Sequence, residues 1–412
     1  MRLKGFEKLT SIDDALKMWF GALQIKKPKA TIASLDAALN RVVAEDIVAK
    51  EDLPRFDRSA VDGYTVRAED TSGASQFKLK NIQIIEEDTI GSTQAKQLWT
   101  GNPLPKGANA VVMLENTKRI KSKIEVWTSV TPGENVSRKG EDMAKGETAI
   151  KTGTRLKPQH LGLMAALGVA EVKIFEKPKI AILATGNELV NLGEKLKEGQ
   201  IFESNRSVLS ALCHELGAEP IDLGIAKDDV NEILEKLKIG IKKADIIITT
   251  GGTSVGASDL VPESVNKIGK PGVIVHGVAM RPAMPTALGV VNGKPIVILS
   301  GNPVAAIIGF EVFARPLISR LLGLKQEEHR LIVEAKITRR VSTTLGRKTF
   351  VRVRVFKRDG AFFAEPISAR GSGLISTMTK ANGYVIVPEN REGLEKGDAV
   401  FVHLFGSVEG AD

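Results

Sequence analysis

Cysteine is nearly absent from the chain, because Cys213 is the only one among its 412 residues. A single thiol excludes an intramolecular disulfide and every zinc or iron–sulfur site built from several cysteines. The five histidines are scattered without the spacing of metal ligands, so a zinc site made of imidazoles is not expected either. Cys213 stands at helical spacing within SVLSALCHELGA, and this pattern predicts a core residue.

Aromatic residues and long apolar runs are also scarce. Phe, Trp and Tyr make up 5% of the chain, which supplies few side chains for stacking on nucleic-acid bases. No apolar run approaches the roughly 20 residues that cross a bilayer, and the N-terminal segment MRLKGFEKLT lacks the apolar core of a signal peptide. The sequence therefore predicts a cytoplasmic protein with no membrane or nucleic-acid partner.

The net charge of +9 is spread thinly along the chain. Residues 331–412 hold 13 lysines and arginines against nine acids, and the rest of the excess is distributed over the first 330 residues. Because no arginine-rich run occurs, the mild positive excess favours attraction of a small polyanionic substrate over binding of nucleic acid.

The length of the chain predicts two to four domains. Residues 178–325 alternate strand-like and helical runs, which predicts an α/β fold with an open, doubly wound sheet that binds ligands at the carboxyl ends of its strands. Three of these ends, TGNE from 185, TTGG from 249 and SGNP from 300, should lie together. We expect a helical linker domain of residues 1–50 and 145–176, a β-rich module of residues 51–144, the α/β domain of residues 177–327, and a C-terminal antiparallel, β-barrel-like domain of residues 328–412.

Three helices are predicted in the linker domain. SIDDALKMWFGAL offers Ser11 as a cap ahead of its apolar positions, and SLDAALNRVVAEDI follows as a second helix. PQHLGLMAALGV predicts a third helix, with Pro158 suited to its first turn.

The string IIITTGGTSVGASD at residues 246–259 carries the strongest functional signal. Its β-branched start predicts a buried strand that breaks into Gly251 and Gly252, where backbone N–H groups can face a phosphate without an intervening Cβ. The hydroxyls of Thr253 and Ser254 add donors. The alternative is a strand-to-helix turn that needs glycine only for its geometry. The candidate ligand contacts in and beside this turn are Thr185, Gly186, Thr250, Gly251, Gly252, Ser254 and Gly256.

Carboxylates follow the same strand ends. Glu188, Asp228, Asp229 and Asp259 are hard oxygen ligands beside the expected phosphate-binding turn, and this combination suits magnesium. For each of these acids alone, helix capping or a solvated loop is the alternative.

A second pair of acids occurs in the β-rich module. Asp62 and Asp142 lie beside glycine in segments without helical or strand periodicity, and such loops often carry function. The alternative for Asp62 is an Asx turn before Gly63.

Several strings taken together resemble the molybdopterin molybdenumtransferase family, which includes the E domain of gephyrin. They are RFDRSAVDGYTV (55–66), TGNPLPKGANAVVMLE (100–115), SRKGEDMAKGE (137–147), ILATGNEL (182–189), TTGGTSVGASD (249–259) and VILSGNPVAA (297–306). They follow the order of the family's signatures and span nearly the whole chain.

The resemblance implies an enzyme of molybdenum cofactor biosynthesis that inserts molybdate or tungstate into adenylylated molybdopterin and releases AMP with magnesium. It also implies a homodimer in which Asp62 and Asp142 reach the α/β pocket of the partner subunit, and the preceding adenylyltransferase as a further partner. Asp228 and Asp259 are the expected magnesium ligands, whereas Asp62 and Asp142 would handle water or protons; Glu188 completes the catalytic acids. The further substrate contacts that it implies are Thr100, Arg138, Arg281, Ser300, Gly301, Asn302, Pro303, Arg352 and Ser376.

The chain departs from the family at the expected oxyanion pocket. Arg281 and Met284 stand where the family has lysines, and Ser300 stands where it has proline before GNP. An arginine fork is not equivalent to a lysine point charge, so the pocket is predicted to be tuned to tungstate or to a different order of binding. The helix that begins near Asn302 would also favour anions at its N-terminus. In the tail, Arg352 and Arg354 alternate with valines on a predicted strand, and a solvated face is the expectation for Arg354.

Two other functions remain open at this point. The α/β domain alone resembles molybdopterin adenylyltransferases, although the module that carries Asp62 and Asp142 has no use in adenylyl transfer. A molybdopterin-binding or scaffold protein without catalysis is the second alternative, and Met284 and Ser300 slightly favour it.

Overall fold

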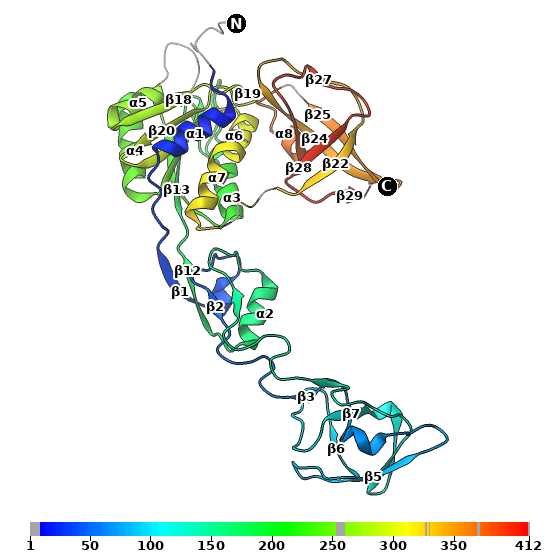
Figure 1. The fold of residues 1–412 in the computed structure, drawn as a ribbon. Coiled ribbons are helices and arrows are strands. Elements are labelled where there is room, and N and C mark those ends of the chain that lie inside the picture. The colour runs from blue at the N-terminus through cyan, green and yellow to red at the C-terminus, as the bar shows by residue number, and fades with distance from the viewer. Residues whose placement is uncertain (1–8, 253–259, 326–327, 329, 369–370, 411–412) are drawn as a thin grey trace. The chain divides into compact units, whose positions relative to one another are not determined.

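Figure 1 shows the computed structural model, which describes residues 9–252, 260–325, 328, 330–368 and 371–410. The chain divides into two compact units, one of Met1–Thr31 with Phe175–Asp412 and one of Ile32–Ile174. Residues 9–31, which we expected in the linker domain, therefore belong with the unit that holds the α/β domain instead. Among the described residues, no helix combines the length and apolar character needed to cross a membrane.

The α/β domain is built on a six-stranded sheet, as the alternating pattern predicted. Its strands β16-β13-β17-β21 run parallel, and β20 and β18 continue the sheet in antiparallel fashion. β13, β17 and β21 are rich in isoleucine, valine and alanine and are buried on both faces, as a sheet covered by helices requires. The bounds are β13 (Lys179–Thr185), β16 (Glu219–Ala226), β17 (Ile246–Thr250), β18 (Pro271–His276), β20 (Ala287–Val291) and β21 (Lys294–Leu299), with a small pair β14 (Leu189–Val190) and β15 (Ile201–Phe202).

Helices cover this sheet. They are α3 (Asn205–Leu216), α4 (Val230–Lys243), α5 (Leu260–Ile268), α6 (Pro303–Gly309) and α7 (Arg315–Leu321), the last two joined by a π-helical turn at Phe310–Ala314. Cys213 on α3 is fully buried, and burial raises the pKa of its thiol to about 12, which confirms its place in the core.

The N-terminal helix α1 (Ile12–Ala22) packs on β18 and β20 of this sheet. Ser11 caps it as predicted, because its hydroxyl accepts a bond from the backbone N–H of Asp14. Trp19 is fully buried and donates its indole N–H to the carbonyl oxygen of Gly289 on β20 at 2.9 Å. This side-chain bond fixes α1 to the α/β domain.

Four charged residues form a network on the helical side of this domain, called here the Glu311 network and comprising Glu215, Glu311, Arg315 and Arg330. Glu311 is 5% exposed and accepts bonds from Arg315 at 2.7 Å and from Arg330 at 2.8 Å. Arg330 also contacts Glu215 of α3 at 2.9 Å. Burial opposes ionisation of Glu311, but the bonds from Arg330 and Arg315 hold its pKa below the ordinary value. The network joins α3, the π-helical turn and the segment that leads to the C-terminal domain.

The C-terminal domain is a closed barrel, as predicted, in which β24, β25, β22, β28 and β26 pair in a ring that returns to β24. It is not antiparallel throughout, as we expected, because β22 pairs with β25 in parallel. Arg354 is exposed, in agreement with the expectation, whereas Arg352 is buried. A short strand of the α/β domain, β19 (Met280–Arg281), also pairs with β24, with Arg281 opposite Thr349. The bounds are β22 (Ile332–Ile337), β23 (Val341–Ser342), β24 (Lys348–Arg358), β25 (Ala361–Ser368), α8 (Ser376–Thr379), β26 (Gly383–Val387), β27 (Gly393–Leu394), β28 (Ala399–Leu404) and β29 (Glu409–Gly410).

The second unit contains a six-stranded β module of order β7-β4-β6-β5-β9-β8 and a small linker domain with its own core. The module has β3 (Arg58–Ser59), β4 (Gly63–Val66), the 3₁₀ turn Ala68–Thr71, β5 (Lys80–Ile84), β6 (Gln94–Leu98), β7 (Ala110–Met113), the 3₁₀ turn Leu114–Asn116, β8 (Thr117–Ile120), β9 (Lys123–Val126) and β10 (Val136–Ser137). The linker domain has β1 (Ala30–Ser34), β2 (Ile47–Val48), β11 (Thr148–Ile150), α2 (Pro158–Ala166) and β12 (Glu171–Phe175). Pro158 begins α2, as predicted.

The predicted helix over SLDAALNRVVAEDI is wrong. Only a 3₁₀ turn at Leu35–Ala38 forms there, and Asn40 follows in the left-handed region with φ of 63°. Val42 and Val43 are then buried in extended backbone that pairs with Arg155 and Ile174. Tertiary pairing of two β-branched residues therefore overrides the helical period of this segment.

Candidate active site

The three strand ends lie side by side, as expected. In the sheet, Ala184 pairs with Thr250, and Thr250 pairs with Leu299. Beyond the strands, the N–H of Gly251 donates to the carbonyl oxygen of Leu299 at 3.1 Å, and that of Gly186 donates to Ala226 at 3.1 Å. The turns that leave β13 and β17 are thus bonded to the neighbouring strands β16 and β21 at one edge of the sheet.

The glycine turn after β17 needs glycine for close approach. Gly251 has φ of 95°, and a Cβ there would lie 2.2 Å from the carbonyl oxygen of Thr185. A Cβ on Gly252 would lie 2.7 Å from Val261. These close contacts alone explain why both positions hold glycine. They agree with the alternative given above, in which the turn needs glycine only for its geometry. The buried hydroxyl of Thr185 has no hydrogen-bond partner within the described ranges, which supports a polar ligand at this turn.

The remainder of the loop, including Thr253, Ser254, Gly256 and Asp259, lies outside the described residues.

Gly251→Ala tests the geometric requirement, with Gly193→Ala as its control. Gly193 also has a left-handed φ, of 88°, but a Cβ there meets nothing within 4 Å. We expect Gly193→Ala to lower the free energy of unfolding by about 1–2 kcal/mol through backbone strain alone. Gly251→Ala should lower it by clearly more, because its Cβ also overlaps Thr185. Urea denaturation of both variants measures the difference; equal losses would show that the close approach contributes nothing.

Two of the predicted carboxylates meet at this edge. The N–H of Asn187 donates to Asp228 at 3.2 Å, and the N–H of Asp228 donates to the side chain of Asn187 at 3.1 Å. The carboxylate of Glu188 lies 2.7 Å from where a Cβ of Gly186 would be. Glu188 and Asp228 are exposed, so their oxygens can reach a ligand. Asp229 instead caps α4 by accepting from a backbone N–H of its first turn.

A pocket of about 260 Å³ lies between the α/β domain and the barrel of the same unit. Of the predicted contacts, Arg281, Ser300, Asn302 and Arg352 line it, as does Met284; the other lining residues are Pro282, Ala283, Pro285, Ala305, Gly371 and Ser372. Arg352 is 2% exposed, and burial lowers the pKa of its guanidinium. A desolvated cation in a cavity favours an anionic ligand because little water competes for it.

Three expected contacts with the oxyanion do not line this pocket. Gly301 lies in the turn after β21, Pro303 begins α6, and Ser376 is exposed on α8. The segment before α8 explains the position of Ser376, because Gly371 and Ser372 occupy the wall of the pocket in its place.

The expected long helix is present, because α6 continues without a break through the π-helical turn into α7, from Pro303 to Leu321. Two backbone N–H groups at its start already have acceptors within the chain. The N–H of Val304 in its first turn donates to the carbonyl oxygen of Ser372 at 3.0 Å, and the N–H of Asn302 approaches the hydroxyl of Ser300 at 3.3 Å. The attraction for an anion therefore rests on the two arginines rather than on the helix end.

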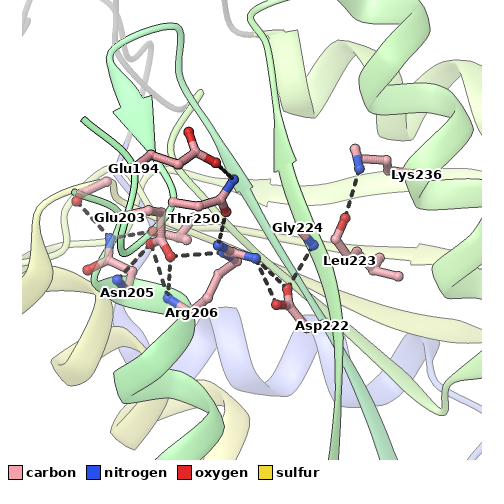
Figure 2. Close-up of polar contacts among 11 residues, drawn as sticks. Glu194, Glu203, Asn205, Arg206, Asp222, Leu223, Gly224, Lys236 and Thr250 are labelled. Atoms are coloured by element: carbon pink, nitrogen blue, oxygen red, sulfur yellow. Dashed lines mark hydrogen bonds and ion pairs between the residues drawn. The ribbon is translucent and has the colours of Figure 1, made fainter. Parts of the chain in front are cut away.

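Sequence reasoning missed a polar cluster at the start of α3, shown in Figure 2. Glu203 is 3% exposed and accepts from the backbone N–H groups of Asn205 and Arg206. Arg206 in turn holds Asp222 through two bonds of 2.7 and 2.8 Å. The amide of Asn205 reaches Thr250 at the glycine turn. The sequence feature that could have indicated this cluster is the polar run Glu203 to Arg206 at the start of an amphipathic helix.

In the second unit, Thr100 holds Asp62 rather than lying free for substrate. One carboxylate oxygen of Asp62 accepts from the backbone N–H of Thr100 at 2.7 Å and from its hydroxyl at 2.8 Å. These two bonds lower the pKa of Asp62, so the exposed carboxylate is ionised at neutral pH. Asp142 and Arg138 are exposed in the same unit, and the N–H of Asp142 donates to Leu53 at 3.0 Å.

Comparison with known proteins agrees with this architecture along the chain. Residues 10–168 match the MoeA N-terminal region (domain I and II), residues 181–320 a probable molybdopterin binding domain, and residues 334–405 the MoeA C-terminal region (domain IV). The chain belongs to the MoeA family. A protein of Methanocaldococcus jannaschii named for molybdopterin biosynthesis is 41% identical over 376 residues, which cover 89% of this chain and 90% of that protein.

Two further relatives support the same placement. The molybdopterin molybdenumtransferase of Bacillus subtilis is 36% identical over 399 residues, covering 94% of this chain and 92% of the enzyme. The crystal structure of the molybdopterin biosynthesis moeA protein from Pyrococcus horikoshii superposes with a TM-score of 0.82 at 32% identity, over 97% of this chain and all of that one. Membership in this family confirms the predicted transferase of molybdenum cofactor biosynthesis that inserts molybdenum.

Proposed function

We propose that this transferase takes its metal as molybdate or tungstate in the pocket of Arg281 and Arg352, and that it releases AMP from adenylylated molybdopterin. The observation that carries this proposal is the pairing of two guanidinium groups in one cavity, one of them almost fully buried. The pocket adjoins the turn at Ser300, whose strand β21 is the neighbour of the strand that ends in the glycine turn. Oxyanion and phosphates would thus bind at one edge of the sheet.

The composition of the pocket fits a dianion. Each guanidinium offers several N–H donors in a rigid fork, and the hydroxyl of Ser300 adds one more donor. The thioether of Met284 supplies no charge, so the two arginines balance a doubly charged tetrahedral oxyanion. These replacements of family lysines and proline support tungstate as a substrate alongside molybdate.

The exposed acids at the strand ends fit magnesium. This ion binds through one or two carboxylates together with water and substrate phosphate oxygens, so a dense cluster of ligands is not needed. Among the described residues, Glu188 and Asp228 would hold it, and Asp259 was predicted beside them. Bound magnesium would neutralise charge on the pyrophosphate. The buried hydroxyl of Thr185, which has no hydrogen-bond partner among the described residues, would meanwhile help to orient the phosphates.

Proton handling falls to Asp62 and Asp142 in this proposal. Attack of water on the phosphoanhydride breaks a P–O bond and releases AMP. Each oxo group that leaves the metal as water takes up two protons, which the dithiolene thiols lose as they bind the metal. The carboxylate of Asp62 is ionised and fixed by Thr100, so it can accept these protons and pass them to the leaving oxo group. We propose that both acids act in the site of a partner subunit, so that the enzyme works as a homodimer beside the adenylyltransferase that supplies its substrate.

Release of AMP from adenylylated molybdopterin tests this function. With magnesium and either molybdate or tungstate, the wild-type chain should release AMP, and Asp142→Ala should reduce the rate by roughly a hundredfold or more through loss of proton transfer. Glu171→Ala removes another exposed acid of the same unit, and as the control it should retain the rate. Release without any oxyanion, or none with either one, would contradict the proposal. A clear preference for molybdate would refute the tungstate part alone.

A second incubation separates this reaction from adenylyl transfer. The chain is supplied with ATP and molybdopterin that carries no AMP. Formation of the AMP adduct would show the adenylyltransferase reaction, which the present proposal does not expect.

A further inference from the structure

We propose that Asn205 is a positioning residue of the oxyanion pocket, which ties the rim at Ser300 and Gly301 to the glycine turn. This inference rests on the function proposed above, because it assigns the pocket its oxyanion. Asn205 is the first residue of α3 and is 6% exposed. It does not line the pocket itself, so its effect must pass through the residues that it holds.

Both hydrogen bonds made by the amide of Asn205 go to the two turns. Its nitrogen Nδ2 donates to the hydroxyl of Thr250 at 2.7 Å and to the carbonyl oxygen of Gly301 at 2.8 Å. A carbonyl oxygen can only accept, so the second bond identifies Nδ2 as the atom that faces it. The amide oxygen makes no hydrogen bond within the described part of the chain. Every polar contact described for this side chain therefore serves the two turns.

Thr250 extends the connection to the pocket. Its hydroxyl accepts from Asn205 and donates to the carbonyl oxygen of Ser300 at 3.1 Å. Asn205 thus holds the backbone of Ser300 through Thr250 and that of Gly301 directly. Ser300 lines the pocket, and Gly301 precedes the lining residue Asn302. Loss of the amide would remove this donor from the buried hydroxyl of Thr250 and from the part-buried carbonyl oxygen of Gly301, and the rim would shift to satisfy them.

A rigid cluster fixes Asn205 from behind, as Figure 2 shows. Glu203 accepts from the backbone N–H of Asn205 at 2.7 Å, and Arg206 bonds Glu203 at 2.9 Å. Arg206 is itself held by Asp222 of β16. Because this N–H is taken by Glu203, the start of α3 serves as an anchor and not as an anion site. The strand β16 is therefore linked to the pocket rim through one chain of bonds.

Asn205→Leu is the first test, because leucine keeps nearly the shape of asparagine and removes both donors without adding charge. Calorimetric titration with molybdate and with tungstate should show binding about tenfold weaker than in the wild type, since a displaced rim no longer meets the oxyanion. Ser207→Ala changes an exposed residue of the same helix and is the control, which should leave the affinity unchanged.

A thiol at the rim gives a second readout that needs no oxyanion. In Ser300→Cys the only other thiol is Cys213, which is fully buried and protonated because its pKa is raised to about 12. A thiol reagent should label Cys at position 300 slowly, and adding Asn205→Leu should raise the rate about tenfold by loosening the rim. Equal labelling rates, or equal oxyanion affinity of Asn205→Leu and the wild type, would overturn the inference. If the wild type binds neither oxyanion, the proposed function fails, and the labelling rates still decide the role of Asn205.

Discussion

Replacing Arg352 with glutamine is expected to weaken binding of molybdate or tungstate by roughly thirtyfold or more, because removing one partner of a buried charge pair costs about 2–5 kcal/mol. Arg352 is 2% exposed on β24 and lines the pocket together with Arg281. Glutamine retains a hydrogen-bond donor, so the loss reports on charge more than on shape. The fold should remain intact, because glutamine is smaller than arginine and brings no charge into the buried position.

The same strand supplies the control. Arg354 lies two residues further along β24 and is exposed, so Arg354→Gln removes an equal charge from the protein without altering the pocket. Its oxyanion affinity should match that of the wild type. Both affinities can be measured by calorimetry at one salt concentration. If Arg352→Gln and Arg354→Gln bind the oxyanion equally well, the pocket is not its site.

Glu311→Gln is expected to lower the free energy of unfolding by about 3 kcal/mol, because it leaves buried guanidinium groups without their carboxylate. Glu311 is 5% exposed, whereas Arg315 and Arg330 are each 13% exposed. The buried Trp19 of the same unit reports unfolding, if Trp99 and Trp127 of the other unit are first replaced by phenylalanine. The control is Glu395→Gln, which breaks an exposed pair with Arg340 and should cost below about 1 kcal/mol. Equal losses would mean that burial of the network adds no stability.

The Glu311 network also predicts a pH dependence. The folded pKa of Glu311 lies below its ordinary value of 4.5, because its bonds with Arg330 and Arg315 outweigh burial. Its contribution is therefore complete above the pKa of the unfolded chain and is lost as the pH falls through the lower folded pKa. Unfolding measured between neutral pH and acid should show this loss in the wild type. Glu311→Gln should lack that component, and an unchanged acid profile would contradict the assignment.

The α/β domain and the barrel were predictable because their strands depend on local patterns. β13, β17 and β21 are continuous apolar runs, and β24 alternates valine with arginine. The antiparallel strands β18 and β20 were not anticipated, since short apolar runs do not reveal the direction of a strand. The segment around Val42 and Val43 was misassigned because its helical period yields to pairing with distant residues.

For the site, sequence identified residues more easily than contacts. Arg281, Ser300 and Arg352 were named from a resemblance, and the structure brings them into one pocket. Asn205 was missed because its bonds join residues 45 and 96 positions away, a separation that no local pattern encodes. Thr100 was assigned to substrate, yet its donors go to Asp62. The contacts of Asn205 and Thr100 depend on the direction in which each side chain points. The spacing of residues along the sequence does not reveal that direction.

The pairing of β19 with β24 limits how this enzyme can be divided or recombined. Arg281 belongs to the α/β domain by sequence, but its strand is hydrogen-bonded to the barrel strand that carries Arg352. An excised α/β domain of residues 177–327 would lose one arginine and the strand partner that orients the other. A chimaera that exchanges oxyanion preference between relatives must therefore transplant two segments together. One is β19 with the turn through Pro285, and the other is β24, which begins about sixty residues later in the chain.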